Sequence, residues 1–240
     1  MRMFQELSAT WLDVLALVMF VGGWLAYAAF AVRHSRTHPN LHNTMDAFRR
    51  EWMLRMIDRD NRMVDVNIMR IQARSSQFFA STTMLVLGAL IALTGYVQQA
   101  LDVVSGLPFT SKASARLLEI KILLLVVVFT YAFFKFTWAI RQLGHGATLI
   151  GAAPRQPPDN PAQYAVVINR IARITGYAGT NFNNGLRAYY FGLAALAWFL
   201  HPVLIIIATA WVIYVLYARE FKSQTLMALI EEDDSPTLRT

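Results

Sequence analysis

Cysteine is absent from this chain, and several kinds of site are excluded with it. Disulfides, thiolate metal ligands and a thiol nucleophile all require cysteine. The Gly-x-Ser-x-Gly, Walker and His-Glu-x-x-His motifs are missing too, and the glycines around His145 lack the spacing of a nucleotide-binding loop. The sequence therefore predicts a non-enzymatic protein with no catalytic residue and no cofactor.

Lysine is also scarce, since 4 lysines stand beside 18 arginines in a chain of formal charge +7. Nine of these arginines fall in the segment from Arg33 to Arg74, which has no lysine. Guanidinium groups bind phosphate and carboxylate in a bidentate manner. Because apolar runs flank this segment, we expect membrane lipids as partners and no nucleic acid.

Long apolar runs are abundant, with 56% hydrophobic residues and a mean hydropathy of +0.39, as in integral membrane proteins. A helix of about 20 apolar residues crosses a bilayer. Five segments approach this requirement, at about residues 11–32, 78–97, 117–140, 186–200 and 203–217. The last two come from one stretch that His201 and Pro202 interrupt. We interpret this stretch as a hairpin of two spans, with one long kinked helix as the alternative.

Basic residues orient these spans, because short loops rich in Arg and Lys stay cytoplasmic. The segments after spans one, three and five are basic, and Arg155 belongs to the second of them. The chain start, the loop with Lys112 and Arg116, and the turn at His201 are poorer in basic residues. This pattern predicts the N-terminus outside and the C-terminus inside. A cleaved signal peptide is disfavoured, because the first run is long and Asp13 lies within it.

Two polar segments are predicted to form a cytoplasmic layer. The first is one amphipathic helix at about 40–74, which Asn40 or Asn43 caps. Its i,i+4 pairs are Asp46–Arg50, Glu51–Arg55 and Asp58–Arg62. This helix lies either in the headgroup plane or packed beneath the spans. The second segment starts with the proline-rich loop 154–161 and continues as a helix that Gly176 and Gly179 are expected to break.

The fold class that follows is an all-α, polytopic transmembrane helical bundle with amphipathic cytoplasmic helices. Residues 1–230 are predicted to form a single domain, and the acidic residues 231–240 are expected to fray.

Polar side chains near the spans are the candidate site residues. Lys135 lies within span three, where an ionisable group is a functional hypothesis by default, although its stem is also long enough to snorkel to the interface. Glu119 and Lys121 either pair with other charges or mark a span boundary. The mouth of span four adds Asn183, Asn184, Arg187 and Tyr189. Binding of an anion or headgroup is predicted for Arg49, Arg50, Arg55, Arg59, Arg62 and Arg187.

The histidines of this chain do not predict a metal site. His34 and His38 have the i,i+4 spacing of paired metal ligands, but Pro39 follows them directly, and we expect no metal site.

Small residues recur at helical spacing, as Ser81, Gly88 and Gly95 in span two and as Gly185, Ala188, Gly192 and Ala195 in span four. Such faces let helices approach closely in lipid. They predict packing within the subunit or between copies, as in a homo-oligomer or a larger membrane complex.

Five blocks of sequence carry a family resemblance. They are residues 44–53 (TMDAFRREWM), 60–65 (DNRMVD), 78–82 (FFAST), 131–138 (YAFFKFTW) and 182–191 (FNNGLRAYYF). Together they resemble the bacterial branch of the domain-of-unknown-function 599 family of membrane proteins, over roughly residues 12 to 225. The resemblance implies a multi-pass protein of the bacterial inner membrane and implies no activity, substrate or site residue.

These features favour a non-enzymatic scaffold or accessory subunit that packs with itself or a partner and engages anionic lipid headgroups. The alternative is a small transporter or channel for an anion or polar solute, which uses Lys135 and Arg187. An enzyme acting on lipid is the third hypothesis.

Overall fold

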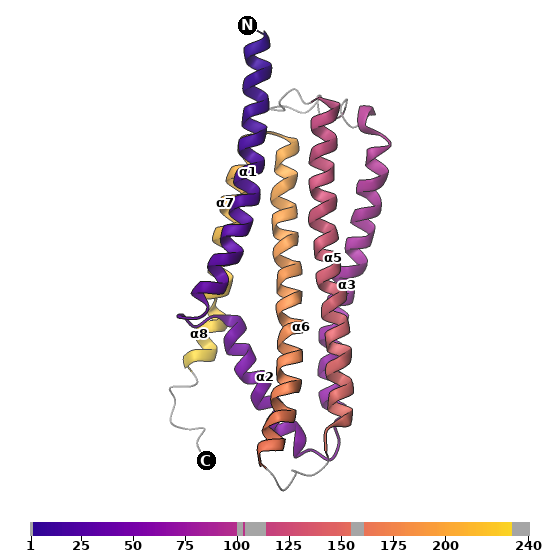
Figure 1. The fold of residues 1–240 in the computed structure, drawn as a ribbon, viewed down its shortest axis with the longest axis vertical. Helices are drawn as coiled ribbons and strands as arrows, with labels where there is room; N and C mark the ends of the chain where they lie inside the picture. The colour runs from indigo at the N-terminus through magenta and orange to yellow at the C-terminus, as the bar shows by residue number, and fades with distance from the viewer. Residues whose placement is uncertain (1, 100–102, 104–113, 155–160, 232–240) are drawn as a thin grey trace. The chain divides into compact units, whose positions relative to one another are not determined.

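The computed structural model describes residues 2–99, 103, 114–154 and 161–231, and all the elements within them are helical. In chain order they are α1 (Arg2–His34), α2 (Leu41–Ile57), α3 (Met63–Thr94), α5 (Ala115–Ala152), α6 (Pro161–Leu196), the 3₁₀ helix η1 (Ala197–Phe199), α7 (Pro202–Phe221) and α8 (Gln224–Glu231) (Figure 1). Lys112, Arg155, most of the proline-rich loop and the acidic tail after Glu231 lie outside the described residues. The all-helical prediction is confirmed for the described part of the chain.

Four segments are long and apolar enough to cross a membrane, namely Trp11–His34, Met63–Thr94, Ala115–Ala152 and Pro202–Ile230. They overlap predicted spans one, two, three and five. Predicted span four, at 186–200, begins inside α6 and is not among them. Asn183, Asn184 and Arg187 lie next to or within its apolar part, and such residues lower the mean hydropathy of any window long enough to span.

The chain divides into two compact units, each assembled from three separate stretches. Unit 1 comprises Met1–Thr37, Thr83–Ala132 and Leu186–Ala218. Unit 2 comprises His38–Thr82, Phe133–Gly185 and Arg219–Thr240. The boundaries fall inside α3, α5 and α6, so each of these helices contributes to both units.

Aromatic packing joins α1, α5 and α6 in unit 1. Phe191 of α6 stacks on Trp24 of α1 with ring centroids 5.1 Å apart, and it meets Phe20 edge-on at 5.9 Å. The next residue, Gly192, leaves room for Phe129 of α5, because a Cβ there would lie 3.0 Å from that ring. Van der Waals contacts of this kind hold helices together where lipid removes the hydrophobic drive.

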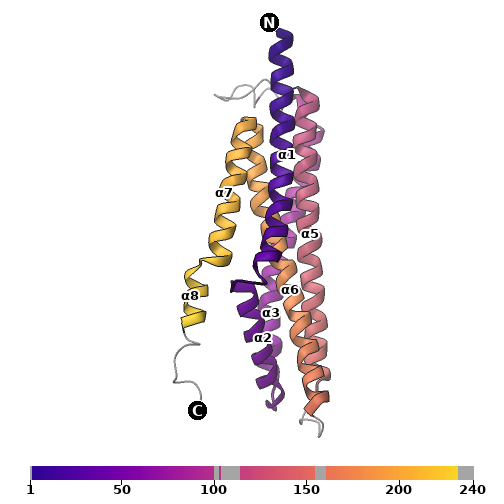
Figure 2. The same ribbon diagram turned by 60° about the vertical axis from the view of Figure 1, so that its left-hand side comes forward.

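The hairpin predicted at His201–Pro202 is present in unit 1. Helix α6 ends at Leu196, the short η1 follows, and α7 begins at Pro202. Proline is favourable in the first turn of a helix, where its missing N–H has no partner to lose. The two helices therefore run in opposite directions from this turn (Figure 2), and one long kinked helix is excluded.

Unit 2 has its own apolar core, to which α2 contributes one face. Its buried members are Met53, Met56, Ile57, Met69, Leu143, Ile150, Ala153, Ile168, Ile171 and Ala178. Helix α8 contacts α2 in the same unit. One face of α2 therefore packs on a protein core, and the placement of this helix relative to the lipid headgroups stays a prediction. Met45 and Phe48, earlier in α2, stay exposed.

Two expectations about helix continuity are wrong. The segment 40–74 is not one helix, because α2 ends at Ile57 and α3 starts at Met63 after a short break, in which Asn61 Oδ1 accepts a hydrogen bond from Met63 N. Conversely, α6 runs unbroken through Gly176 and Gly179. These glycines serve close approach, since a Cβ would lie 3.1 Å from Asp46 Oδ1 at Gly176 and 2.8 Å from Arg49 Nη2 at Gly179.

Candidate functional site

A buried cluster of Asp13, Lys121 and Trp198 is the main polar feature of unit 1. Lys121 is 1% exposed and Asp13 is 5% exposed. The Trp198 indole N–H donates to Asp13 Oδ1 at 2.6 Å, and Lys121 Nζ lies 3.8 Å from the same oxygen. Lys121 Nζ also donates to the Trp198 carbonyl at 2.8 Å and lies 5.3 Å from the centroid of its ring. Three elements, α1, α5 and η1, thus meet at one carboxylate.

The break after α6 explains why a carbonyl is available to Lys121. The final carbonyls of a helix have no intrahelical partner. In the turn, Leu200 N and His201 N both donate to Ala197 O, and Trp198 O is left to the lysine. Between the two options open for Lys121, the structure shows pairing with another charge. Glu119 lies about one turn after the start of α5 and is exposed.

Lys135 belongs to a separate polar chain in unit 2. Its Nζ donates to Asn181 Oδ1 at 3.3 Å, and Asn181 Nδ2 donates to Gln142 Oε1 at 2.9 Å. The lysine is half-buried between α5 and α6. Asn181, which the lysine contacts, and Gln142, which Asn181 contacts, were not among the predicted site residues. Asn181 lies 46 residues from Lys135 and 39 from Gln142, so no local spacing relates it to either residue.

The amide, arginine and tyrosine candidates at the start of the predicted fourth span differ in exposure and in the contacts they make. Asn183 is exposed and Asn184 is half-buried. The Tyr189 hydroxyl lies 2.8 Å from Thr83 Oγ1 of α3. The Arg187 guanidinium lies 5.5 Å from the centroid of the Tyr27 ring of α1, a cation–π distance. Tyr189 and Arg187 therefore link helices inside unit 1.

Of the five proposed headgroup arginines between Arg49 and Arg62, four have partners within the protein. Arg49 pairs with Asp46, Arg55 pairs with Glu51, and Arg59 Nη1 contacts Asp65 Oδ1 at 2.6 Å. Arg62 donates to the carbonyl of Ile150 in the last turn of α5 and to those of Ala153 and Pro154 just beyond it. Arg50 is exposed.

The predicted pairs are therefore correct only in part. Glu51–Arg55 is present, whereas Asp46 pairs with Arg49 rather than Arg50, because Arg49 is the arginine that faces α6 at Gly179. Asp58–Arg62 is wrong, because α2 ends at Ile57, before both residues, and i,i+4 proximity is lost.

Asp65 is a second buried carboxylate. It is fully buried, and its Oδ1 accepts from the Trp52 indole N–H at 2.7 Å as well as from Arg59. Trp52 belongs to α2 and Asp65 to the first turn of α3, so this carboxylate fastens the two helices across the break.

Histidines in the described residues do not gather with carboxylates in threes. Helix α1 ends at His34, so His34 and His38 do not share a helical face. His42 Nε2 lies 2.9 Å from Thr180 Oγ1 and 3.5 Å from Asp46 Oδ2, an arrangement that joins α2 to α6.

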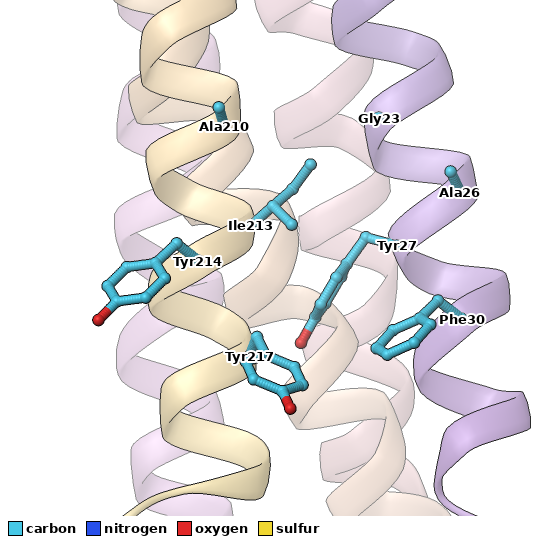
Figure 3. Close-up of a pocket in the computed structure, with 8 residues that line it drawn as sticks. All are labelled: Gly23, Ala26, Tyr27, Phe30, Ala210, Ile213, Tyr214 and Tyr217. Atoms are coloured by element: carbon cyan, nitrogen blue, oxygen red, sulfur yellow. The ribbon is translucent and has the colours of Figure 1, made fainter.

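A groove of about 440 Å³ lies between α1 and α7 in unit 1 (Figure 3). Its wall residues are Gly23, Ala26, Tyr27, Phe30, Ala210, Ile213, Tyr214 and Tyr217. Gly23 faces the side chains of Thr209 and Ile213, while Phe30 lies 6.2 Å from Tyr217, centroid to centroid. Residue numbers therefore increase in the same direction on both helices, so α1 and α7 run parallel along the groove.

Comparisons with known proteins give a family and no activity. A family model described as "Protein of unknown function, DUF599" matches residues 15–225. No curated protein matches the chain, and no solved structure does.

Proposed function

The chain belongs to the DUF599 family, whose function is unknown, and we propose that it is a non-enzymatic scaffold or accessory subunit of the bacterial inner membrane. It crosses the membrane five times, with the N-terminus outside and the C-terminus inside. It packs with itself or a partner and engages anionic lipid headgroups.

The observation that carries this proposal is that the ionisable groups closest to the apolar segments hold helices together. Lys121 joins α5 to Asp13 of α1 and to the Trp198 carbonyl, and Lys135 joins α5 to Asn181 of α6. A transport pathway needs such groups to exchange partners with a solute. The groove between α1 and α7 is lined mainly by apolar atoms and includes neither lysine.

Small residues on α3 and just beyond it support packing with another helix. Ser81, Gly88 and Gly95 are exposed, and a Cβ on Gly88 would have no neighbour within 4 Å. The small residues of α6 have the opposite environment, since Gly185, Ala188, Gly192 and Ala195 are all buried. In membranes, small residues allow close helix contact, so the exposed set suits a second copy or a partner.

Reconstitution of the full chain into liposomes tests this proposal against transport. We expect uptake of chloride, phosphate and small carboxylates to equal that of protein-free liposomes. We also expect the protein to retain phosphatidylglycerol in preference to phosphatidylcholine after detergent extraction. Saturable anion uptake that disappears in Lys135→Met or Arg187→Gln, at unchanged protein incorporation, contradicts the scaffold proposal.

A further inference from the structure

The groove between α1 and α7 changes character along its length. Gly23, Ala26, Ala210 and Ile213 form an aliphatic half. Further along both helices, the lining becomes aromatic, and the hydroxyl groups of Tyr27 and Tyr217 point toward the end of the groove marked by Phe30 (Figure 3). An apolar half and a hydroxyl-bearing end match a ligand with a hydrocarbon chain and a polar head.

The two helices that form the groove have the length and apolar composition of membrane spans. Both lie in segments long and apolar enough to cross a membrane. Tyr214 on one wall is 61% exposed and Phe30 on the other is 42% exposed, so the groove opens to the side. Its volume of about 440 Å³ falls within the range of about 300–1,000 Å³ found for ligand pockets.

Two arginines, Arg33 and Arg187, stand near the hydroxyl-bearing end. The Arg187 guanidinium lies 5.5 Å from the Tyr27 ring centroid. His34 stacks on Phe30 with centroids 4.9 Å apart, and Arg33 precedes it in the last turn of α1. Tyr27 and Phe30 both line the groove, so positive charge adjoins its polar end and complements a phosphate.

We infer that this groove holds one acyl chain of an anionic phospholipid, with the phosphate at the tyrosine end near Arg33 and Arg187. The inference rests on the proposed engagement of anionic lipid and assigns it to a place other than the arginine-rich helix. A neutral lipid fits the aliphatic half but not the charge at the other end. The other competing occupant is a helix from a second copy, whose binding would not require a phosphate.

Native mass spectrometry of the full chain tests the assignment. The protein is extracted from nanodiscs that contain equal parts of phosphatidylglycerol and phosphatidylcholine with identical acyl chains. Ala26→Phe fills the aliphatic half with a ring, and Ala29→Phe is its matched control, since Ala29 is also an exposed alanine of α1 but does not line the groove. We expect Ala26→Phe to lower retained phosphatidylglycerol at least about tenfold and Ala29→Phe to leave it unchanged.

Arg33→Gln tests the head-group end separately. One basic residue near a lipid surface contributes about a fivefold preference for an anionic lipid. We therefore expect this variant to reduce the preference for phosphatidylglycerol over phosphatidylcholine about fivefold while a lipid is still retained. An unchanged preference would place the phosphate elsewhere and overturn the assigned orientation.

The remaining outcomes separate the groove from the broader proposal. If Ala26→Phe is unstable, Ala210→Phe on the opposite wall replaces it with the same expected loss. Full retention of phosphatidylglycerol by a folded groove variant overturns the groove assignment but leaves lipid engagement intact. An absence of any lipid preference in the unmodified protein overturns both. If the unmodified protein forms a dimer that a groove variant loses, and lipid retention is unchanged, the groove binds a second copy and the lipid assignment is overturned.

Discussion

Lys121→Met lowers the free energy of unfolding by about 3–5 kcal/mol, the typical cost of breaking a buried ion pair by removing one partner. The variant leaves the Asp13 carboxylate buried beside the Trp198 indole, and the Trp198 carbonyl loses its donor. Asp13→Leu is expected to cost a similar amount, because Lys121 and the indole N–H then lack the carboxylate. Reversible unfolding in bilayer-like micelles, followed by steric trapping, measures both.

The double variant distinguishes a specific pair from general damage. With Asp13→Leu and Lys121→Met combined, no unpaired charge remains, so we expect it to be more stable than the sum of the two single variants predicts, by about 1–3 kcal/mol. Glu119→Gln is the matched control, since this exposed carboxylate lies on the same helix and should change stability by less than about 0.5 kcal/mol. Additive single and double variants would show that Asp13 and Lys121 do not act together.

Gly185→Ala destabilises the protein by about 1–3 kcal/mol, the usual cost of overpacking. A Cβ on Gly185 would lie 2.6 Å from Phe136 Cε1, within the hard-sphere limit. Phe136 cannot turn aside easily, because it is buried, stacks on Phe79 at 5.3 Å and meets Phe182 edge-on at 5.7 Å. The same unfolding measurement applies.

Gly88→Ala is the matched control for that substitution. Its Cβ would have no neighbour within 4 Å, so the expected effect is a gain of up to about 1 kcal/mol from helix propensity. Phe136→Leu in the Gly185→Ala background should recover part of the loss by giving the new methyl group room. A loss at Gly185 no larger than at Gly88 would mean that α5 and α6 do not approach closely at this point.

Structural features that depend on neighbouring residues could be predicted from the sequence more successfully than features that depend on residues far apart in the chain. Asn40 caps α2 by accepting from Asn43 N at 2.8 Å, as expected of the residue after Pro39, and Pro202 starts α7. Both depend on residues close together in the chain. The break between α2 and α3 was missed, because the i,i+4 charge pattern continues across it and the contacts that favour two helices are tertiary, such as Trp52 with Asp65.

The buried cluster shows why the candidate site could be predicted only in part. Lys121 was recognised as an ionisable residue near the end of a span, and Asp13 as one inside the first run. Nothing in either neighbourhood specifies that they share a partner, since Trp198 lies 77 residues from Lys121 and 185 from Asp13. The usable signal was their equivalent depth, because all three residues fall near the ends of predicted spans one, three and four that the charge pattern assigns to the outside.

The arginine-rich segment also offers fewer arginines for lipid binding than its composition suggested. Arg49, Arg55, Arg59 and Arg62 support α2 and the end of α5 through carboxylates and carbonyls. A guanidinium has five N–H donors, and one that already pairs with a carboxylate or carbonyl has fewer of them left for a lipid phosphate. Engagement of headgroups by this helix is therefore best examined at Arg50, which is exposed.

Five crossings with the N-terminus outside is the central claim, since the depth of the buried cluster and the orientation of the groove both depend on it. The absence of native cysteine lets each introduced cysteine report its own side of the membrane. A membrane-impermeant maleimide should label Gln98→Cys and His201→Cys in right-side-out vesicles. Thr37→Cys and Gly151→Cys should react only after permeabilisation. Labelling of His201→Cys and Gly151→Cys from the same side would show that α6 does not cross and would contradict the account.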